Sequence, residues 1–185
     1  MKIDKSWTLF LDRDGVINKR IPGGYVRKWE EFEFIRHAPE AIKLLSQTFG
    51  RVLVVSNQQG IGKGIMTEAD LEEVHRKMTE HITKAGGRID RIYHSPFRAE
   101  ENSHYRKPNT GMADHAGRDF PGIDFRRSVM AGDSESDMHF GRRMKMTTVL
   151  ITGDPAGALN DPSLADYVFP DLITFARALP ELSTE

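Results

Sequence analysis

The sequence predicts an α/β protein with a doubly wound, mainly parallel sheet and helices on both faces, which gives three layers. Two observations support this prediction. Short apolar runs alternate along the chain with longer segments of helical period, a pattern typical of βαβ units with right-handed crossovers. The length of 185 residues suits a single domain, which we expect to span residues 1–185 and to bury a sizeable core.

Strands are predicted where short apolar and β-branched runs stand between turn residues. In chain order these runs lie at 7–11, 51–55, 88–94, 128–131, 147–152 and 167–169. Helices are predicted where apolar residues recur every three or four positions. In chain order they lie at 39–50, 67–85, 111–118, 136–144 and 172–179. The second helix is the best defined, because Thr67 is a typical N-cap and Gly86-Gly87 a typical stop. Within it, His75 and His81 are expected to be exposed.

Composition limits the classes of function. The chain is 38% hydrophobic and 29% charged with a net charge of -1, which is typical of a globular protein. A pI of about 6.7 lacks the basic excess of a nucleic-acid binder and favours a small ligand. The absence of cysteine excludes disulfides and thiolate metal sites. No segment has the length of a signal peptide's apolar region or of a membrane span, so we expect a cytoplasmic protein without a membrane partner. The oligomeric state stays open.

Polar residues stand at the predicted carboxyl ends of three strands. Asp12 and Asp14 follow the first strand, Ser56 and Asn57 follow the second, and Asp133 follows the fourth. In sheets of this kind, ligands bind outside the carboxyl ends of the strands, near the point where the strand order reverses. We therefore expect these side chains to converge on one edge of the sheet.

Three further charged residues are expected at the same edge. The long irregular segment 94–110 carries Arg106 and Lys107, and loops of this length within a compact domain are often functional. Asp137 stands four residues after Asp133, in the next predicted helix. A lysine would then face the acids at the strand ends.

These residue types fit phosphoryl transfer. Clustered carboxylates repel one another unless a cation neutralises them, and hard oxygen ligands favour Mg²⁺. One carboxylate can attack phosphorus while a second acid protonates the leaving oxygen and then activates water; Asp12 and Asp14 fit these roles. A hydroxyl, a backbone amide and a lysine, for which Ser56, Asn57 and Lys107 are candidates, would stabilise the oxygens of the transferring group.

Four segments of the sequence carry a family resemblance. FLDRDGVIN, VSNQQGIGKG, YRKPNTGM and MAGDSESDM, in this order, resemble motifs one to four of the haloacid dehalogenase (HAD) superfamily of phosphatases. More closely, they resemble the subgroup of histidinol-phosphate and D-glycero-D-manno-heptose 1,7-bisphosphate phosphatases. The resemblance implies a Rossmann-like core, with Asp12 as the nucleophile and Asp14 as the general acid and base. It also implies Mg²⁺ held by the Asp12 side chain, the Asp14 backbone carbonyl and Asp133.

The same resemblance implies roles for four other residues. Ser56 and Lys107 would bind the phosphoryl group, and Asp137 would orient Lys107 or a metal-bound water. Arg106 would contact the substrate beyond its phosphate. Only about 20 residues separate Gly15 from the next helix, so we expect a short flap and no cap domain.

The chain departs from the subgroup in the segment HSPFRAEENSHYRKP. Many members bind a structural zinc there through a Cys-x-His and a Cys-x-Cys pair, whereas Ser95, Phe97, Ser103 and Tyr105 stand at the corresponding positions of this chain. A structural zinc needs about four ligands, which two histidines do not supply. We predict that no zinc binds, and that the loop is held by packing of Phe97 and Tyr105 or is mobile.

Two classes of function stay open at this stage. The first is an Mg²⁺-dependent phosphatase of a small phosphorylated metabolite through an aspartyl-phosphate intermediate, with heptose 1,7-bisphosphate ahead of histidinol phosphate. Within this class, YRKPNTGMADH also resembles the nucleic-acid 3′-phosphatase domain of polynucleotide kinase-phosphatases, although the bulk charge makes nucleic acid an unlikely partner. The second class is a non-catalytic phosphate-binding module, against which the intact Asp12, Asp14, Lys107 and Asp133 argue.

Overall fold

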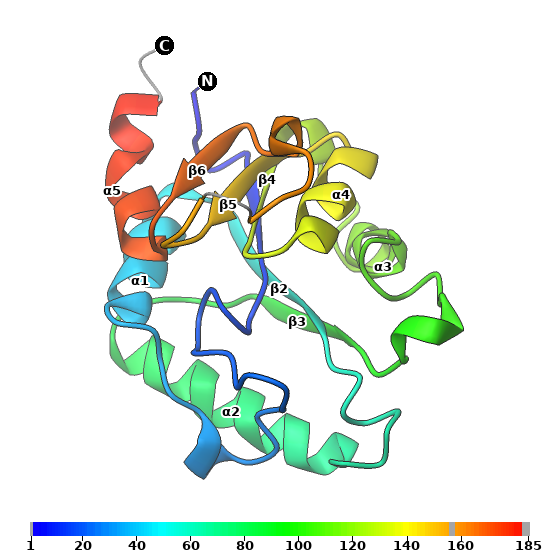
Figure 1. Cartoon of the computed structure of the whole chain (residues 1–185). Helices are drawn as coiled ribbons and strands as arrows, with labels where there is room; N and C mark the ends of the chain where they lie inside the picture. The colour runs from blue at the N-terminus through cyan, green and yellow to red at the C-terminus, as the bar shows by residue number, and fades with distance from the viewer. Residues whose placement is uncertain (1, 156–157, 183–185) are drawn as a thin grey trace.

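The computed structural model describes residues 2–155 and 158–182. In this part of the chain, six parallel strands form one sheet in the order β3-β2-β1-β4-β5-β6 (Figure 1). The strands are β1 (Thr8–Leu11), β2 (Arg51–Asn57), β3 (Arg91–Ser95), β4 (Ser128–Gly132), β5 (Thr147–Ile151) and β6 (Tyr167–Phe169). The predicted doubly wound parallel sheet is confirmed.

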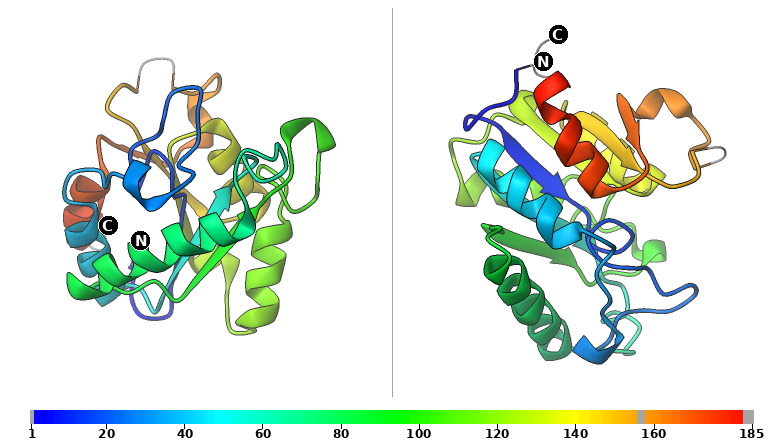
Figure 2. Two further views of the ribbon diagram at one scale, coloured as in Figure 1. Left: turned by 90° about the horizontal axis from the view of Figure 1, so that it is seen from below. Right: turned by 90° about the vertical axis from the view of Figure 1, so that its left-hand side faces the viewer.

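Helices cover both faces of the sheet and confirm the three layers. They are α1 (Ala38–Thr48), α2 (Glu68–Lys84), α3 (Gly111–Asp119), α4 (Glu135–Arg143) and α5 (Leu172–Leu182). Helices α1, α2 and α5 lie on one face and α3 and α4 on the other, as Figures 1 and 2 show together. Every helix in the described ranges is too short or too polar to cross a membrane.

The two faces divide the core because successive strand side chains point in opposite directions. In β1, Leu9 and Leu11 pack with α1, α2 and α5, whereas Phe10 packs with α3 and α4. In β2, Val54 follows the first pattern and Val55 the second. All five side chains are fully buried, so this alternation fixes the register of the central strands.

The third strand begins later than the sequence predicts, at Arg91 instead of residue 88. Arg88 donates hydrogen bonds to the carbonyls of Phe49 and Gly50 just beyond α1, and its guanidinium pairs with Asp90. Asp90 in turn accepts a hydrogen bond from the Val52 amide. The residues before Arg91 therefore fasten the end of α1 to the sheet edge instead of extending the strand.

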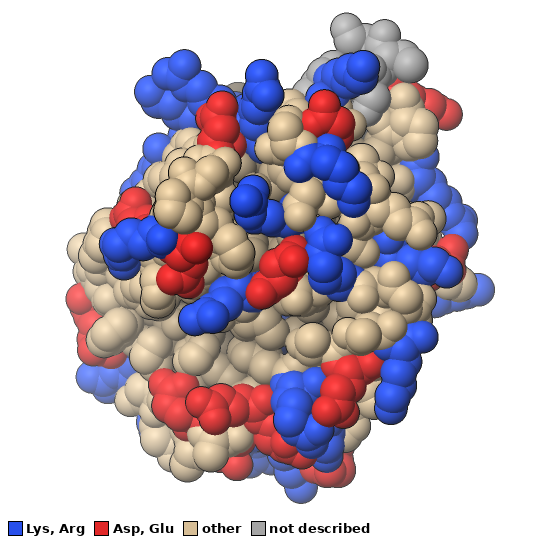
Figure 3. Space-filling model, turned by 180° about the vertical axis from the view of Figure 1, so that it is seen from behind, with Lys and Arg blue, Asp and Glu red and all other residues tan. Residues whose placement is uncertain are grey.

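Between β1 and α1, a stretch that the structure describes in full, the chain forms a short flap of turns and one 3-10 helix, Trp29–Glu31, and no cap domain. On the surface drawn in Figure 3, basic and acidic side chains are interspersed. That face therefore offers no continuous basic tract for a polyanion.

Candidate active site

The strand ends converge at the switch point of the sheet. From β1 the chain continues outward through β2 and β3, and then returns to place β4 on the other side of β1. The amide of Asp12 donates to the carbonyl of Ala131 at 2.9 Å, which extends the β1–β4 pairing by one residue. Asp12 and Asp133 therefore emerge next to each other, in the place where folds of this type bind ligands.

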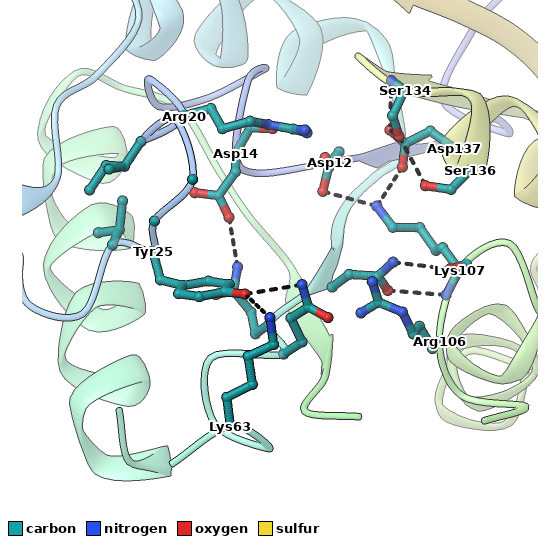
Figure 4. A pocket seen from close by; sticks show the side chains of 17 residues that line it. Asp12, Asp14, Arg20, Tyr25, Lys63, Arg106, Lys107, Ser134, Ser136 and Asp137 are labelled. Carbon is teal, nitrogen blue, oxygen red and sulfur yellow. Dashed lines mark hydrogen bonds and ion pairs between the residues drawn. The ribbon is translucent and has the colours of Figure 1, made fainter. Parts of the chain in front are cut away.

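Lys107 is the central cation of the site. Its Nζ donates to Asp12 Oδ1 at 2.9 Å and to the Val55 carbonyl at 2.7 Å, and it forms a 2.6 Å ion pair with Asp137 (Figure 4). Burial opposes the charge of this 2% exposed side chain, but the two carboxylates raise the pKa of Lys107 above its ordinary value. Lys107 is therefore a permanent cation between two buried acids.

Asp137 is fixed by the start of α4. Ser134 is the N-cap, and its backbone amide and hydroxyl both donate to Asp137 Oδ2 in a capping box. A Cβ at Gly132 would lie only 2.3 Å from the Asp137 Cβ, so glycine allows β4 to approach this carboxylate. Asp137 is wholly buried, and its other oxygen is left to Lys107.

Asp12 and Asp133 both have raised pKa values, as expected of clustered acids whose charges are not fully neutralised by nearby cations. Burial, with the charges of Asp137 and Asp14, outweighs the Lys107 charge and raises the pKa of Asp12 to about 6. Burial and the Asp12 and Asp137 charges raise the pKa of Asp133 to about 7. A further positive charge would relieve this repulsion.

The donor set fits a magnesium ion. Carboxylate oxygens of Asp12, Asp133 and Asp137 lie within 4.8 Å of one another, the one such group of potential metal ligands found in the described residues. Arg20 Nη2 donates to Asp133 Oδ1 at 2.7 Å and to the Asp14 carbonyl at 3.3 Å. The Asp133 carboxylate and the Asp14 carbonyl thus both bind the Arg20 guanidinium. Hard oxygen donors of this kind suit Mg²⁺.

Asp14 has a very different environment from Asp12. Arg13 Nη2 donates to both of its carboxylate oxygens at 2.9 Å, Asn18 donates to one and Gln58 to the other. Burial works against ionisation, but the Arg13 charge and these hydrogen bonds outweigh it and hold the pKa of Asp14 below its ordinary value. Asp14 is therefore an oriented carboxylate.

His75 contradicts the prediction of an exposed helix residue. It is 8% exposed, on the buried side of α2, and its Nε2 lies 3.1 Å from Arg13 Nη1. Burial, with the charges of Arg13 and His94, overcomes the opposing effect of Asp14 and lowers the pKa of His75 well below its ordinary value. His75 is neutral at neutral pH, whereas His81 is exposed as predicted.

The two predicted phosphate ligands at the end of β2 differ in position. Ser56 is 1% exposed, does not line the cavity beside Lys107, and accepts a hydrogen bond from Gln58. Asn57 lines that cavity, but its side-chain amide is bonded to the backbone of Lys107 in both directions, at 3.0 Å each. In this arrangement Asn57 positions Lys107, and the direct phosphate roles of both residues remain predictions.

A cavity of about 500 Å³ opens above Asp12 and Lys107. Its outer wall carries Tyr25 from the flap, Lys63 from the loop after β2, and Arg106 (Figure 4). Lys63 donates to the Tyr25 hydroxyl at 2.9 Å, and Arg106 donates to the Phe97 carbonyl at 3.1 Å. Neither cation has a carboxylate partner among the described residues, so both can receive an anionic group of a ligand.

The loop at 94–110 is ordered by contacts that the sequence only partly predicts. Tyr105 packs against the core and hydrogen-bonds His115, as expected of a packing residue. Phe97 is 38% exposed, so the prediction that it packs the loop is wrong. Instead, the Pro96 carbonyl accepts from Gly62. The prediction that no zinc binds here stays a prediction.

Arg20 and Gln58 are site residues to which the sequence analysis gave no role. Arg20 stands on the flap, beyond the four motifs, and only the need of the acid cluster for cations could have indicated it. Gln58 directly follows the predicted phosphate ligands, and it links Asp14 to Ser56. In the sequence, only its polar side chain next to Ser56 and Asn57 could have indicated that Gln58 belongs to the site.

Comparisons with known proteins agree on one family. A model of the HAD-hydrolase-like family matches residues 104–175. A D-glycero-alpha-D-manno-heptose-1,7-bisphosphate 7-phosphatase of Mycobacterium tuberculosis is 34% identical over 174 residues, covering 94% of this chain and 91% of that protein. A D-glycero-beta-D-manno-heptose-1,7-bisphosphate 7-phosphatase of Haemophilus influenzae is 31% identical over 182 residues, covering 94% and 97%.

A solved structure supports the same relationship. The D,D-heptose 1,7-bisphosphate phosphatase of B. bronchiseptica, complexed with magnesium and phosphate, matches with a TM-score of 0.86 and 26% identity, covering 98% of this chain and 99% of that one. The fold, the acid cluster at the switch point and these matches define the class: the protein is a phosphatase, a hydrolase of phosphate esters. The chain belongs to the HAD superfamily, in the subgroup of heptose 1,7-bisphosphate phosphatases.

Gly15→Ala is expected to disrupt the site through Asp133. Gly15 has a φ of 93°, and a Cβ there would lie 1.8 Å from Asp133 Oδ2. Because displacements of about 1 Å can cost about 100-fold in rate, we expect at least that loss of phosphate release. Gly86→Ala is the matched control, since Gly86 has a φ of 86° but meets only the Lys43 side chain at 3.4 Å. Equal activities of the two variants would contradict the prediction.

His75 should make the protein sensitive to acid. Below about pH 6.5 the unfolded chain protonates His75, while the folded state keeps it neutral. As the pH is lowered, the free energy of unfolding therefore decreases by up to about 1.4 kcal/mol per pH unit. Arg13, Asp14 and His94 are the charged or titratable groups acting on the ring. In urea unfolding between pH 7 and pH 5, the free energy of unfolding of His75→Gln should fall less steeply than that of the wild type. Parallel curves would mean that His75 has the same pKa in the folded and unfolded states, which would contradict the prediction.

The zinc prediction is tested by elemental analysis. Because cysteine is absent from the sequence, we expect far less than one zinc per chain in protein purified without chelators. One equivalent would contradict the prediction.

Proposed function

We propose that the protein hydrolyses the 7-phosphate of D-glycero-D-manno-heptose 1,7-bisphosphate in an Mg²⁺-dependent reaction. The relatives that cover nearly the whole chain are named for this substrate. The observation that carries the proposal is the charge layout of the cavity, where Lys107 lies at the base and Lys63 and Arg106 lie on the outer wall. A bisphosphate can place one phosphate beside Lys107 and the other beside Lys63 and Arg106.

In the proposed reaction, Asp12 attacks the phosphorus atom and forms an aspartyl phosphate. The bond between phosphorus and the sugar oxygen breaks, and Asp14, which enters the reaction protonated although Arg13 favours its ionised form, gives that oxygen its proton. Lys107 stabilises the charge on the phosphoryl oxygens. Water then attacks the phosphorus atom, Asp14 accepts its proton, and inorganic phosphate leaves Asp12 free.

The proposed metal ligands are the carboxylates of Asp12 and Asp133 and the backbone carbonyl of Asp14. A bound Mg²⁺ would neutralise the acids and the incoming phosphate, which otherwise repel each other. Arg20, whose side chain is 54% exposed, can turn toward solvent and release its two oxygens. Asp137 would keep Lys107 in place.

Asp12→Asn is expected to remove turnover. An amide cannot act as the nucleophile, so phosphate release should fall by at least about a thousandfold. Release is measured with both anomers of heptose 1,7-bisphosphate, histidinol phosphate and a 3′-phosphorylated oligonucleotide, each with Mg²⁺ and with EDTA. Glu33→Gln, on an exposed ion pair with Lys19, is the control. No turnover of any substrate by folded wild type would refute the enzyme, and preference for another ester would refute the heptose.

Arg106→Ala is expected to weaken binding of the second phosphate. We expect KM for the 1,7-bisphosphate to rise about tenfold, the effect of losing one charge-assisted hydrogen bond, and KM for a monophosphate to change much less. Arg98→Ala, in the same loop, is the control, because Arg98 pairs with Glu100 and Glu101 and does not line the cavity. Equal rises for both substrates would contradict the proposed layout.

A further inference from the structure

Arg13 stands between the two catalytic candidates in the sequence, yet it does not line the cavity. Its side chain is fully buried. Nη2 donates to both oxygens of Asp14, Nη1 lies 3.1 Å from His75 Nε2, and Nε has no hydrogen-bond partner among the described residues. The guanidinium is therefore held at two points, Asp14 on one side and His75 on the other.

The alternating side-chain directions along β1 explain why the Arg13 side chain points away from the cavity. Leu9 and Leu11 face α1, α2 and α5, and Arg13 continues the same parity just beyond the strand. On α2, His75 is buried beside Val74, on the helix face that meets this side of the sheet. The arginine thus reaches a helix that forms no wall of the cavity.

The chemistry of the contact defines the state of His75. A guanidinium has only donors, so Nε2 must accept the hydrogen bond, which requires a neutral ring protonated on Nδ1. The lowered pKa of His75 agrees with this state. Without an acceptor at this position, Nη1 would be a buried donor with no partner, and the guanidinium would lose the contact that fixes its rotation.

Arg13 differs from the other side chains bonded to Asp14 because its Nη2 contacts both carboxylate oxygens, at 2.9 Å each. Asn18 donates to Oδ1 and Gln58 to Oδ2, and each is a single contact. The Arg13 Nη2 contact alone spans both oxygens and so fixes the plane of the carboxylate. The orientation of Asp14 therefore follows the orientation of Arg13.

We propose that Arg13 and His75 are positioning residues for proton transfer: His75 fixes the guanidinium of Arg13, and Arg13 fixes the carboxylate of Asp14. The inference rests on the proposed role of Asp14 as general acid and base. His75 acts only through Arg13, from outside the cavity. Loss of the histidine acceptor should therefore slow the step in which the leaving oxygen is protonated.

The test compares two kinds of leaving group. The ratio kcat/KM reports the steps up to departure of the leaving group. A sugar oxygen needs a proton to leave, whereas the p-nitrophenolate of p-nitrophenyl phosphate does not. Impaired proton transfer lowers kcat/KM for the sugar phosphate alone, whereas a damaged fold lowers it for both esters.

His75→Leu should lower kcat/KM for the sugar phosphate about tenfold or more, the scale of a weakened general acid, and change that for p-nitrophenyl phosphate less than about threefold. His75→Gln, which restores an acceptor oxygen, should return the sugar phosphate to within about threefold of wild type. Val74→Ala is the matched control, because it removes core packing from the same helix while the hydrogen-bond partners of Arg13, His75 and Asp14, stay in place. It should lower Tm and leave both kcat/KM values near wild type.

A uniform loss for both esters in His75→Leu, or no loss, would overturn the proposal. Should His75→Leu fail to fold, Arg13→Lys makes the same comparison, because lysine keeps the charge but cannot span Asp14 and His75. Asp14→Asn distinguishes the proposed general-acid role of Asp14 from the proposed positioning role of Arg13 and His75. If it lowers both esters equally, the general-acid role itself fails, whereas selective loss in Asp14→Asn without any in His75→Leu refutes the positioning pair alone.

Discussion

The mutual repulsion of three carboxylates at one edge of the sheet, two of them buried and one half-buried, is the constraint on which the site depends. Asp12, Asp133 and Asp137 converge within a few ångströms of one another, and an uncompensated charge in such a place is costly. Lys107 compensates two of the three, and the exposed Arg20 shares the third. Because the internal cation faces Asp12 and Asp137, the remaining oxygens face the place where a metal and a phosphate can enter.

The backbone around this cluster is arranged to hold Lys107. Asn57, at the end of β2, bonds both the amide and the carbonyl of Lys107, although 50 residues separate them. The capping box of α4 fixes Asp137 on the other side of the lysine. Two strands and a helix start thus determine the position of one ammonium group, whereas the flap residue Arg20 has no comparable support.

Much of this site could be predicted from the sequence because it follows from topology. Strand ends in a parallel sheet meet at one edge, so Asp12 and Asp133 were expected together. Arg20 and the Asn57 amide could not be placed, because their partners depend on the path of long connections. His75 is a different case, because it lies four residues after Leu71 and three before Met78, on the apolar stripe of α2. This spacing indicated burial, but the polar side chain led to the prediction of an exposed residue.

The opposite electrostatic environments of Asp12 and Asp14 follow from the same alternation. Asp12 has the parity of Phe10 and faces the side of α3 and α4, where Lys107 and Asp137 lie and where burial, together with the neighbouring acids, raises its pKa to about 6. Asp14 stands beyond the paired part of the strand, and Arg13, with the parity of Leu11, turns beneath it toward α2. One residue between the two acids therefore separates a carboxylate that belongs to the acid cluster beside Lys107 from one held by an internal arginine. The proposed roles of nucleophile and proton carrier rest on this difference, since Asp12 lies against Lys107 at the cavity, whereas Asp14 is oriented by Arg13 from beneath.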